Sequence, residues 1–207
     1  MVDTQIRPSD VTKYPIIEAM LNVPREDFVP NALRGAAYAD ASVDLDGGRT
    51  VLEPRTFAKM LDGLDIENDE MVLDLGCGLG YSAAVIARMS DFVIALEPSE
   101  ALAAEAEERL SDAGVDNVAV IAGELTNGAP KHGPYDVIIL EGGVEQVPDA
   151  LLDQLKDGGR IAAIFIDGRA GSVRIGHKHN GHVDWRLAFN ASAPLLTGFD
   201  VETEFAL

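Results

Sequence analysis

The sequence predicts an α/β fold, with a mostly parallel sheet, helices on both of its faces and a C-terminal antiparallel hairpin. Three observations support this. From about residue 68, short and nearly continuous apolar runs alternate with helical segments, as in parallel sheets that are buried on both faces. One of these runs leads into a glycine-rich turn at residues 76–80. Later, Asn180-Gly181 separates two strand-like runs, which is a strong hairpin signal.

Two helices are expected before the sheet. Residues 11–23 have apolar side chains at helical spacing and end before a proline, and residues 56–64 form a second helix that a proline introduces. The segment between them, residues 38–54, is irregular, acidic and glycine-bearing, and long irregular loops in compact domains are often functional. We therefore expect residues 1–67 to form a helical extension with a substrate loop, and residues 68–207 to form one compact core.

The core is expected to alternate strand and helix in chain order. Strands are predicted at residues 72–75, 93–96, 118–122, 135–140 and 160–166, and helices at 82–89, 100–110 and 149–155. The closing hairpin pairs residues 172–175 with 182–189. Ligands of parallel sheets bind beyond the carboxyl ends of the strands, so chemistry is expected at that edge.

The turn after the first core strand is the strongest functional signal. Glycines at 76, 78 and 80 allow a sharp turn and let a ligand approach the main chain, and the helix beginning near Tyr81 points its amides at the same place. Glu97 ends the next apolar run, 21 residues after Gly76, where an acidic residue binds a ribose hydroxyl pair in such folds. The alternative is a tight turn that binds no ligand.

Composition limits the classes of partner. The chain has 207 residues, a formal net charge of −19 and one cysteine. The acidic balance argues against a nucleic-acid partner, and a single cysteine excludes an internal disulfide. The N-terminal segment does not resemble a signal peptide, and the apolar runs are too short to span a membrane. We therefore expect a cytoplasmic protein without a nucleic-acid or membrane partner.

Motifs along most of the chain match one family. They lie at residues 1–7, 23–30, 38–40, 73–81, 135–140, 151–160 and 193–198, the last of which resembles the family's C-terminal strand. On these residues the chain resembles the protein-L-isoaspartate O-methyltransferases, a branch of the S-adenosylmethionine-dependent methyltransferases with a Rossmann-like sheet. The glycine motif is shared by many methyltransferases, whereas the N-terminal motifs are specific to this branch.

The resemblance implies S-adenosyl-L-methionine as the cofactor, an isoaspartyl-containing protein or peptide as the substrate, and no metal. The glycines would approach the amino acid part and ribose of the cofactor, and Glu97 would accept hydrogen bonds from the ribose hydroxyls. Glu124 would reach toward the adenine amine, and Glu141 would line the methyl-transfer cleft, with a structural charge at a strand end as the equal alternative. The implied cofactor residues are Asp74, Gly76, Cys77, Gly78, Gly80, Tyr81, Ser82, Glu97, Pro98, Gly123, Glu124, Leu125 and Glu141.

The loop before the core departs from the family pattern. Where the family has a serine, this chain has Leu52, which carries no hydroxyl; Thr50 and Glu53 are the other candidates in the substrate loop. Asp44, Asp46 and Glu53 would also repel an anionic substrate. We hypothesise that cofactor binding is retained while isoaspartyl activity is weak, absent or redirected. Retained activity is the other hypothesis, and the sequence does not separate the two.

Other functions are weighed against this one. A nicotinamide dehydrogenase shares the glycine turn and the acid, but usually has a glycine or alanine where this chain has Tyr81. A non-catalytic binding module on the same fold is the second alternative. His177, His179 and His182 favour a polar surface hairpin over a metal site, because no cysteine or carboxylate at ligand spacing accompanies them. Cys77 is expected to fill space in the turn.

Overall fold

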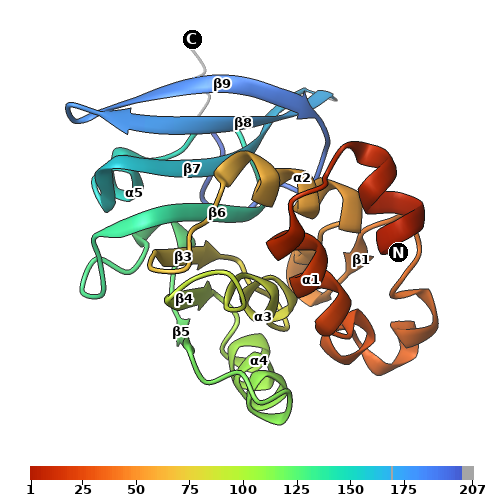
Figure 1. Cartoon of the computed structure of the whole chain (residues 1–207). Coiled ribbons are helices and arrows are strands. Elements are labelled where there is room, and N and C mark those ends of the chain that lie inside the picture. The colour runs from red at the N-terminus through yellow and green to blue at the C-terminus, as the bar shows by residue number, and fades with distance from the viewer. Residues whose placement is uncertain (169, 202–207) are drawn as a thin grey trace, which may run out of the picture.

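A seven-stranded sheet forms the centre of the computed structural model, which describes residues 1–168 and 170–201 except for the side chain of Asp46 (Figure 1). The strand order is β5-β4-β3-β6-β7-β8-β9. The bounds are β3 Met71–Leu75, β4 Phe92–Glu97, β5 Val118–Ala122, β6 Tyr135–Val144, β7 Leu155–Asp167, β8 Ala170–His179 and β9 His182–Asn190. Strands β3 to β7 are parallel, and β8 and β9 are antiparallel additions at one edge. The predicted fold class is confirmed.

Both faces of the sheet are buried, as the continuous apolar strands predict. Val72 of β3 belongs to the same hydrophobic cluster as Phe57 of α2 (Pro54–Leu64), and the neighbouring Leu73 belongs to a second cluster with Leu151 of α5 (Asp149–Leu152). Because successive side chains of a strand point to opposite faces, these two clusters cover the two sides of the sheet. Helices α1 (Tyr14–Asn22) and α3 (Tyr81–Ile86) join the first cluster.

The strand order reverses between β3 and β6, and this reversal determines where along the sheet a ligand is expected to bind. The chain runs from β3 through α3, β4, α4 (Glu100–Asp112) and β5 to one side, then returns to pair β6 with the other side of β3. Ser99 caps α4 by accepting a hydrogen bond from the amide of Leu102 at 3.3 Å, as its residue type predicts. In parallel sheets the crevice beyond the carboxyl ends at such a reversal is where ligands bind.

Several predicted element boundaries were wrong. The helix expected over residues 149–155 ends at Leu152, because Leu155 already pairs with Tyr135 and begins β7. The helix expected over 82–89 is α-helical only to Ile86, after which the amide of Met89 donates to the Ile86 carbonyl in a tighter turn.

Residues 193–198 were expected to form a strand, but with the described parts of the chain they form a single bridge, between Leu195 and Gly143. The amide of Gly143 donates to the Pro194 carbonyl and that of Leu196 to the Gly143 carbonyl, both at 2.8 Å. Proline has no amide hydrogen to donate to a strand neighbour, so pairing does not extend through residue 194.

The segment before the core is more ordered than the sequence suggests. The helix expected over residues 11–23 begins at Tyr14, with Pro15 in its first turn. Short helical turns follow α1, and the segment expected to be irregular contains a small antiparallel pair, β1 (Val43–Asp44) and β2 (Thr50–Val51). Figure 1 shows β1 beside α1 and α2, on one side of the sheet. None of the helices in the described segments is long and apolar enough to cross a membrane.

Candidate functional site

The glycine turn is held by backbone hydrogen bonds to the adjacent strand. The amides of Gly76 and Cys77 donate to the Leu96 carbonyl at 2.7 and 3.4 Å, and the Gly80 amide donates to the Cys77 carbonyl at 2.9 Å. Gly76, Gly78 and Gly80 have φ of 87°, 56° and 92°, a region that side chains strongly disfavour. The three glycines are therefore required by the backbone, independently of any ligand.

Glu97 faces this turn from the end of β4. Its side chain is fully buried, and its carboxylate accepts hydrogen bonds from the amides of Gly78 at 2.9 Å and Ser99 at 3.3 Å. These amides fix the orientation of the carboxylate. A buried carboxylate held in this way has lone pairs left to accept hydrogen bonds from a pair of hydroxyl groups.

Asp74 lies on β3 beneath the turn and is also fully buried. One carboxylate oxygen accepts a hydrogen bond from the Ser82 hydroxyl at 2.6 Å, and the other has no partner among the described residues. Burial raises the pKa of Asp74 to about 7, against the opposing effects of the Ser82 hydrogen bond and the Arg49 charge.

Glu141 reaches the same region through an irregularity in β6. Between Ile139 and Gly143 the register against β7 shifts, and Glu141 lies within the shifted segment. Such bulges redirect side chains at the ends of strands. Burial, together with the nearby charge of Asp74, raises the pKa of Glu141 well above its ordinary value. One of its oxygens has no hydrogen-bond partner among the described residues.

A loop covers the glycine turn; we call it the flap and define it as residues 43–52. Arg49 of the flap places its Nε 3.3 Å from both carboxylate oxygens of Glu97, and its Nη2 donates to the Gly76 carbonyl. The Arg49 side chain is only 7% exposed. A Cβ built on Gly76 would collide with the Arg49 guanidinium, and one built on Gly78 would lie 2.7 Å from Leu45 Cδ1. Flap side chains therefore fill the open faces of two of the glycines.

Little space remains between the flap and the glycine turn. A cavity of about 10 Å³ lies between the flap and the turn, lined by Thr50, Val51, Leu52, Phe57, Gly76, Cys77, Tyr81, Ser82 and Glu141. Small-molecule sites usually have volumes of about 300–1,000 Å³. In this conformation the site is closed.

Arg25 anchors the far end of the flap. This fully buried guanidinium donates from Nη2 to the Leu52 carbonyl at 2.8 Å and from Nε to the Ala37 carbonyl at 2.8 Å. It also lies 4.8 Å from the ring centroid of Tyr81, close enough for a cation–π contact. Tyr81 thus joins the start of α3 to the flap, and burial raises the pKa of its hydroxyl to about 12, so the hydroxyl stays protonated.

The substrate-loop candidates have separate surroundings. The Thr50 hydroxyl donates to the Val43 carbonyl at 3.1 Å and so closes the β1–β2 pair. Leu52 is 2% exposed and is one of the residues that line the small cavity. Glu53 precedes α2 and accepts a hydrogen bond from the Thr56 hydroxyl at 2.5 Å. Asp44 is exposed, and the side chain of Asp46 lies outside the described part of the structure.

The remaining predicted cofactor residues do not share one environment. The Gly123 amide donates to the Glu97 carbonyl at 3.1 Å, which places the end of β5 beside the end of β4. Pro98 and Glu124 are exposed, and the Glu124 carboxylate accepts a hydrogen bond from Asn127 at 3.0 Å. Leu125 is buried in the core of the second sheet face.

Cys77 is buried in the turn, and burial raises the pKa of its thiol well above the ordinary value. A thiol that stays protonated is a poor nucleophile, which agrees with a space-filling role.

Sequence reasoning missed the roles of Arg25 and Arg49. Both lie in segments that were singled out, one in an N-terminal motif and the other in the substrate loop. The only signal was chemical: a basic residue that is buried requires partners, which are backbone carbonyls and the Tyr81 ring for Arg25 and the Glu97 carboxylate for Arg49. Neither the partner nor the burial could be read from spacing.

The geometry fits a cofactor that carries a ribose and a positive charge. The turn offers close approach to the main chain, Glu97 offers a charged acceptor, and the space in front of them already accommodates a cation, the Arg49 guanidinium. Asp74 and Glu141 lie within the same buried region. These features suit the binding of a nucleoside-containing cation once the flap has moved.

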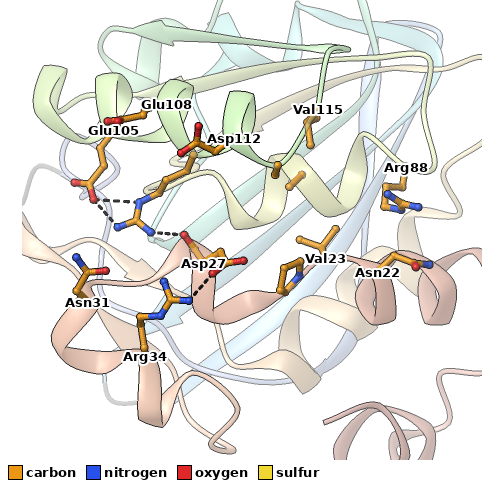
Figure 2. A pocket seen from close by; sticks show the side chains of 14 residues that line it. Asn22, Val23, Asp27, Asn31, Arg34, Arg88, Glu105, Glu108, Asp112 and Val115 are labelled. Carbon is orange, nitrogen blue, oxygen red and sulfur yellow. Dashed lines mark hydrogen bonds and ion pairs between the residues drawn. The ribbon is translucent and has the colours of Figure 1, made fainter.

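A larger hollow lies elsewhere and contains none of the predicted site residues. It has a volume of about 540 Å³ and lies between the segment after α1 and helix α4. Arg109 donates to the Glu105 carboxylate and to the Asp27 backbone carbonyl. Figure 2 shows Arg34 beside Asp27, with whose carboxylate it forms an ion pair at 2.6 Å. Most of its charged groups therefore neutralise one another. In the described segments no three His, Cys, Asp or Glu side chains form a group that could hold a metal ion, and this includes the hairpin histidines.

Comparison with known proteins gives one consistent family. The sequence profile described as Protein-L-isoaspartate(D-aspartate) O-methyltransferase (PCMT) matches residues 1–187. Protein-L-isoaspartate O-methyltransferase 2 of Pelobacter propionicus is 39% identical over 161 residues, which cover 78% of this chain and 72% of that protein. Protein-L-isoaspartate O-methyltransferase of Herpetosiphon aurantiacus is 39% identical over 163 residues, covering 79% and 73% of the two chains.

Solved structures agree on the fold. A protein-L-isoaspartate O-methyltransferase structure superposes with a TM-score of 0.81 at 26% identity, covering 93% of this chain and 63% of that one. A candidate protein-L-isoaspartate O-methyltransferase from Plasmodium falciparum, in complex with S-adenosyl-L-homocysteine, superposes with a TM-score of 0.80 at 21% identity. It covers 92% of this chain and 94% of that one.

Proposed function

The chain belongs to the protein-L-isoaspartate(D-aspartate) O-methyltransferase family, and we propose that it methylates the carboxylate of isoaspartyl residues in damaged proteins. It is an S-adenosylmethionine-dependent methyltransferase. The observation that carries the proposal is the family match over residues 1–187. The buried Glu97 carboxylate facing the glycine turn supports it independently, because this is the chemistry that a ribose-bearing cofactor needs.

We assign the cofactor to the glycine turn and its surroundings. Gly76, Gly78 and Gly80 would allow close approach, Glu97 would bind the ribose hydroxyls, and Asp74 with Glu141 would lie near the positive charge. When bound, S-adenosylmethionine supplies an electrophilic methyl group on a sulfonium cation. Cys77, Ser82 and Gly123 would support this site through the backbone and the Asp74 hydrogen bond.

The residues of the chain contribute positioning and water exclusion. An acceptor carboxylate is ionised near pH 7, so no general base is needed, and alignment supplies most of the rate. Leu52, Phe57 and Tyr81 line the small cavity and would exclude water from it. The raised pKa of Glu141 disfavours its charged form and so weakens its repulsion of an anionic acceptor, and the protonated Tyr81 hydroxyl is available as a donor.

One observation favours a second candidate function, methylation of a different acceptor. Leu52 is buried, apolar and lines the cavity, at the position where the family pattern has a serine. It offers no hydrogen bond to the acceptor carboxylate. A hydrogen bond to a charged group contributes about 1.5–3 kcal/mol, so its loss would slow isoaspartyl methylation by about tenfold or more.

The test compares methyl transfer from labelled S-adenosylmethionine to an isoaspartyl peptide and to the same peptide with ordinary aspartate. We expect slow, base-labile labelling of the isoaspartyl peptide only, and an increase of about tenfold in Leu52→Ser. Leu52→Ala is the matched control, because it removes the same side chain without adding a hydroxyl. Unfolding in urea is measured in parallel, since truncating a buried leucine costs about 2–5 kcal/mol.

The outcomes separate the two candidate functions. Labelling that is absent from wild type and from Leu52→Ser, in proteins that still bind the cofactor, would contradict isoaspartyl methylation and favour a different acceptor. Equal labelling of both peptides would also contradict it.

A further inference from the structure

We propose that Arg49 is an internal competitor of the cofactor: its guanidinium holds the flap closed on Glu97, and the cofactor binds only when Arg49 leaves. This inference rests on the proposed function, because it takes the site at the glycine turn to be the cofactor site. It assigns to Arg49 the control of cofactor affinity.

The first argument is competition for the same atoms. Arg49 Nε lies 3.3 Å from each Glu97 carboxylate oxygen, and these oxygens are the acceptors that a ribose hydroxyl pair would use. The Nη2 of Arg49 also donates to the Gly76 carbonyl, at the backbone that a ligand must approach. With the Gly78 and Ser99 amides already bound, the two oxygens of this carboxylate cannot accept from Arg49 Nε and from a ribose diol at the same positions.

The second argument is competition for the same space. The missing side chain of Gly76 leaves a hollow that the Arg49 guanidinium fills, and Leu45 fills that of Gly78. Only about 10 Å³ remains between the flap and the turn. Because the turn is fixed by its hydrogen bonds to Leu96, the flap is the part that must move.

The third argument is charge. Asp74, Glu97 and Glu141 are all buried within one region, and Arg49 is the cation that contacts Glu97 directly. Removal of the guanidinium without replacement would leave the Glu97 charge buried and unpaired, which is unfavourable. A cationic ligand can take over this role, so exchange of Arg49 for S-adenosylmethionine preserves the local charge balance.

The tip of the flap can move, whereas its end at residue 52 is anchored. Its strands, β1 and β2, are two residues each, and Gly47 and Gly48 form its tip with φ of 69° and 74°. Arg25 secures the opposite end through the Leu52 carbonyl. The tip with Arg49 can therefore swing away while residue 52 remains in place.

The experiment measures binding of S-adenosylmethionine and S-adenosylhomocysteine to the full-length chain by titration calorimetry. The variants are Arg49→Gln, which removes the charge but keeps a polar side chain, and Arg49→Ala. Arg55→Ala is the matched control, an exposed arginine on the neighbouring helix. If the closed state dominates, apparent affinity is reduced by the fraction of open molecules, so we expect both Arg49 variants to bind both ligands at least about tenfold more tightly. Arg55→Ala should bind like wild type.

A second measurement covers the case in which Arg49→Ala folds poorly. Thermal denaturation without ligand should show a lower melting temperature for Arg49→Gln than for wild type, because Glu97 loses its partner, and a larger upward shift on adding S-adenosylhomocysteine. A gain in affinity with this larger shift supports the proposal. Unchanged or weaker binding in Arg49→Gln would overturn it while leaving the cofactor assignment intact. If neither wild type nor any variant binds either ligand, the cofactor assignment and the proposal both fall.

Discussion

The glycine turn is held by backbone hydrogen bonds to β4, whereas the flap that covers it is held by two arginine side chains. The turn keeps its shape through the Leu96 carbonyl, the Glu97 carboxylate that accepts from the Gly78 amide, and its own glycines. The flap needs Arg25 at one end and Arg49 at the other. Backbone contacts of the first kind belong to the sheet and are as stable as the sheet. Side-chain contacts of the second kind can be exchanged for a ligand.

Under the proposed function, this difference explains how a closed site can still bind a cofactor. The rigid wall, which is the glycine turn with Glu97, carries the groups that we assign to the cofactor. The flap carries Arg49, which fills the space in front of them. Three changes break or sharpen this contrast, in order of decreasing effect.

The largest effect is expected from Arg25→Ala. This change removes a fully buried guanidinium and leaves the Ala37 and Leu52 carbonyls without their donor. Because unpaired buried polar groups cost about 1–3 kcal/mol each, we expect the free energy of unfolding to fall by about 3 kcal/mol. Urea denaturation measures this change. Arg55→Ala is the control and should stay within about 0.5 kcal/mol of wild type. A loss below about 1 kcal/mol would show that Arg25 does not anchor the flap.

The next effect concerns the rigid wall alone and is measured in the Arg49→Gln background, where the competitor is absent. Adding Glu97→Gln removes the charged acceptor, and affinity for S-adenosylhomocysteine should fall about 100-fold, which corresponds to about 2.7 kcal/mol. Glu107→Gln in the same background is the control and should change affinity by less than about threefold, since Glu107 is an exposed residue of α4 with no role in the assigned site. Equal losses in the two variants would remove Glu97 from its assigned role.

The smallest effect is on the pH dependence of the free energy of unfolding and arises from Asp74. Burial raises the pKa of Asp74 to about 7 from its ordinary value of 3.8. The folded protein therefore binds more protons than the unfolded chain between about pH 4 and pH 7, and the free energy of unfolding decreases as the pH rises through this window. Asp74→Asn should remove about 2.5 kcal/mol of the decrease between pH 5 and pH 8.

The measurement is urea denaturation of wild type and Asp74→Asn at several pH values, with Asp44→Asn as an exposed control. Arg49→Gln should make the wild-type dependence steeper, because the Arg49 charge lowers the Asp74 pKa. Parallel pH profiles for wild type and Asp74→Asn would contradict the raised pKa.

Much of the fold followed from local pattern. Continuous apolar runs such as residues 93–96 predicted parallel strands buried on both faces, and Asn180-Gly181 predicted the hairpin between β8 and β9. The predictions failed where pairing with a distant strand decided the outcome. Leu155 looked helical from its neighbours, but its pairing with Tyr135 places it in β7.

The residues of the candidate site also differ in whether the sequence alone could place them. Glu97 could be placed by counting from the glycine turn, because strand, turn, helix and strand are consecutive and their geometry fixes the spacing. Arg49 could not be placed, since it lies 48 residues from Glu97 and a loop brings the two together. Asp74 and Glu141 were named as site residues, but their raised pKa values depend on burial that several elements create.

The sequence by itself determined the sheet, the glycine turn and the acid that faces it, because each arises from short-range periodicity and backbone conformations that particular residues allow. Only the tertiary structure decided that the site is closed and that Arg49 closes it. The reason is physical: a buried charge is stabilised by whichever opposite charge the whole fold brings within reach, and no local pattern specifies that partner.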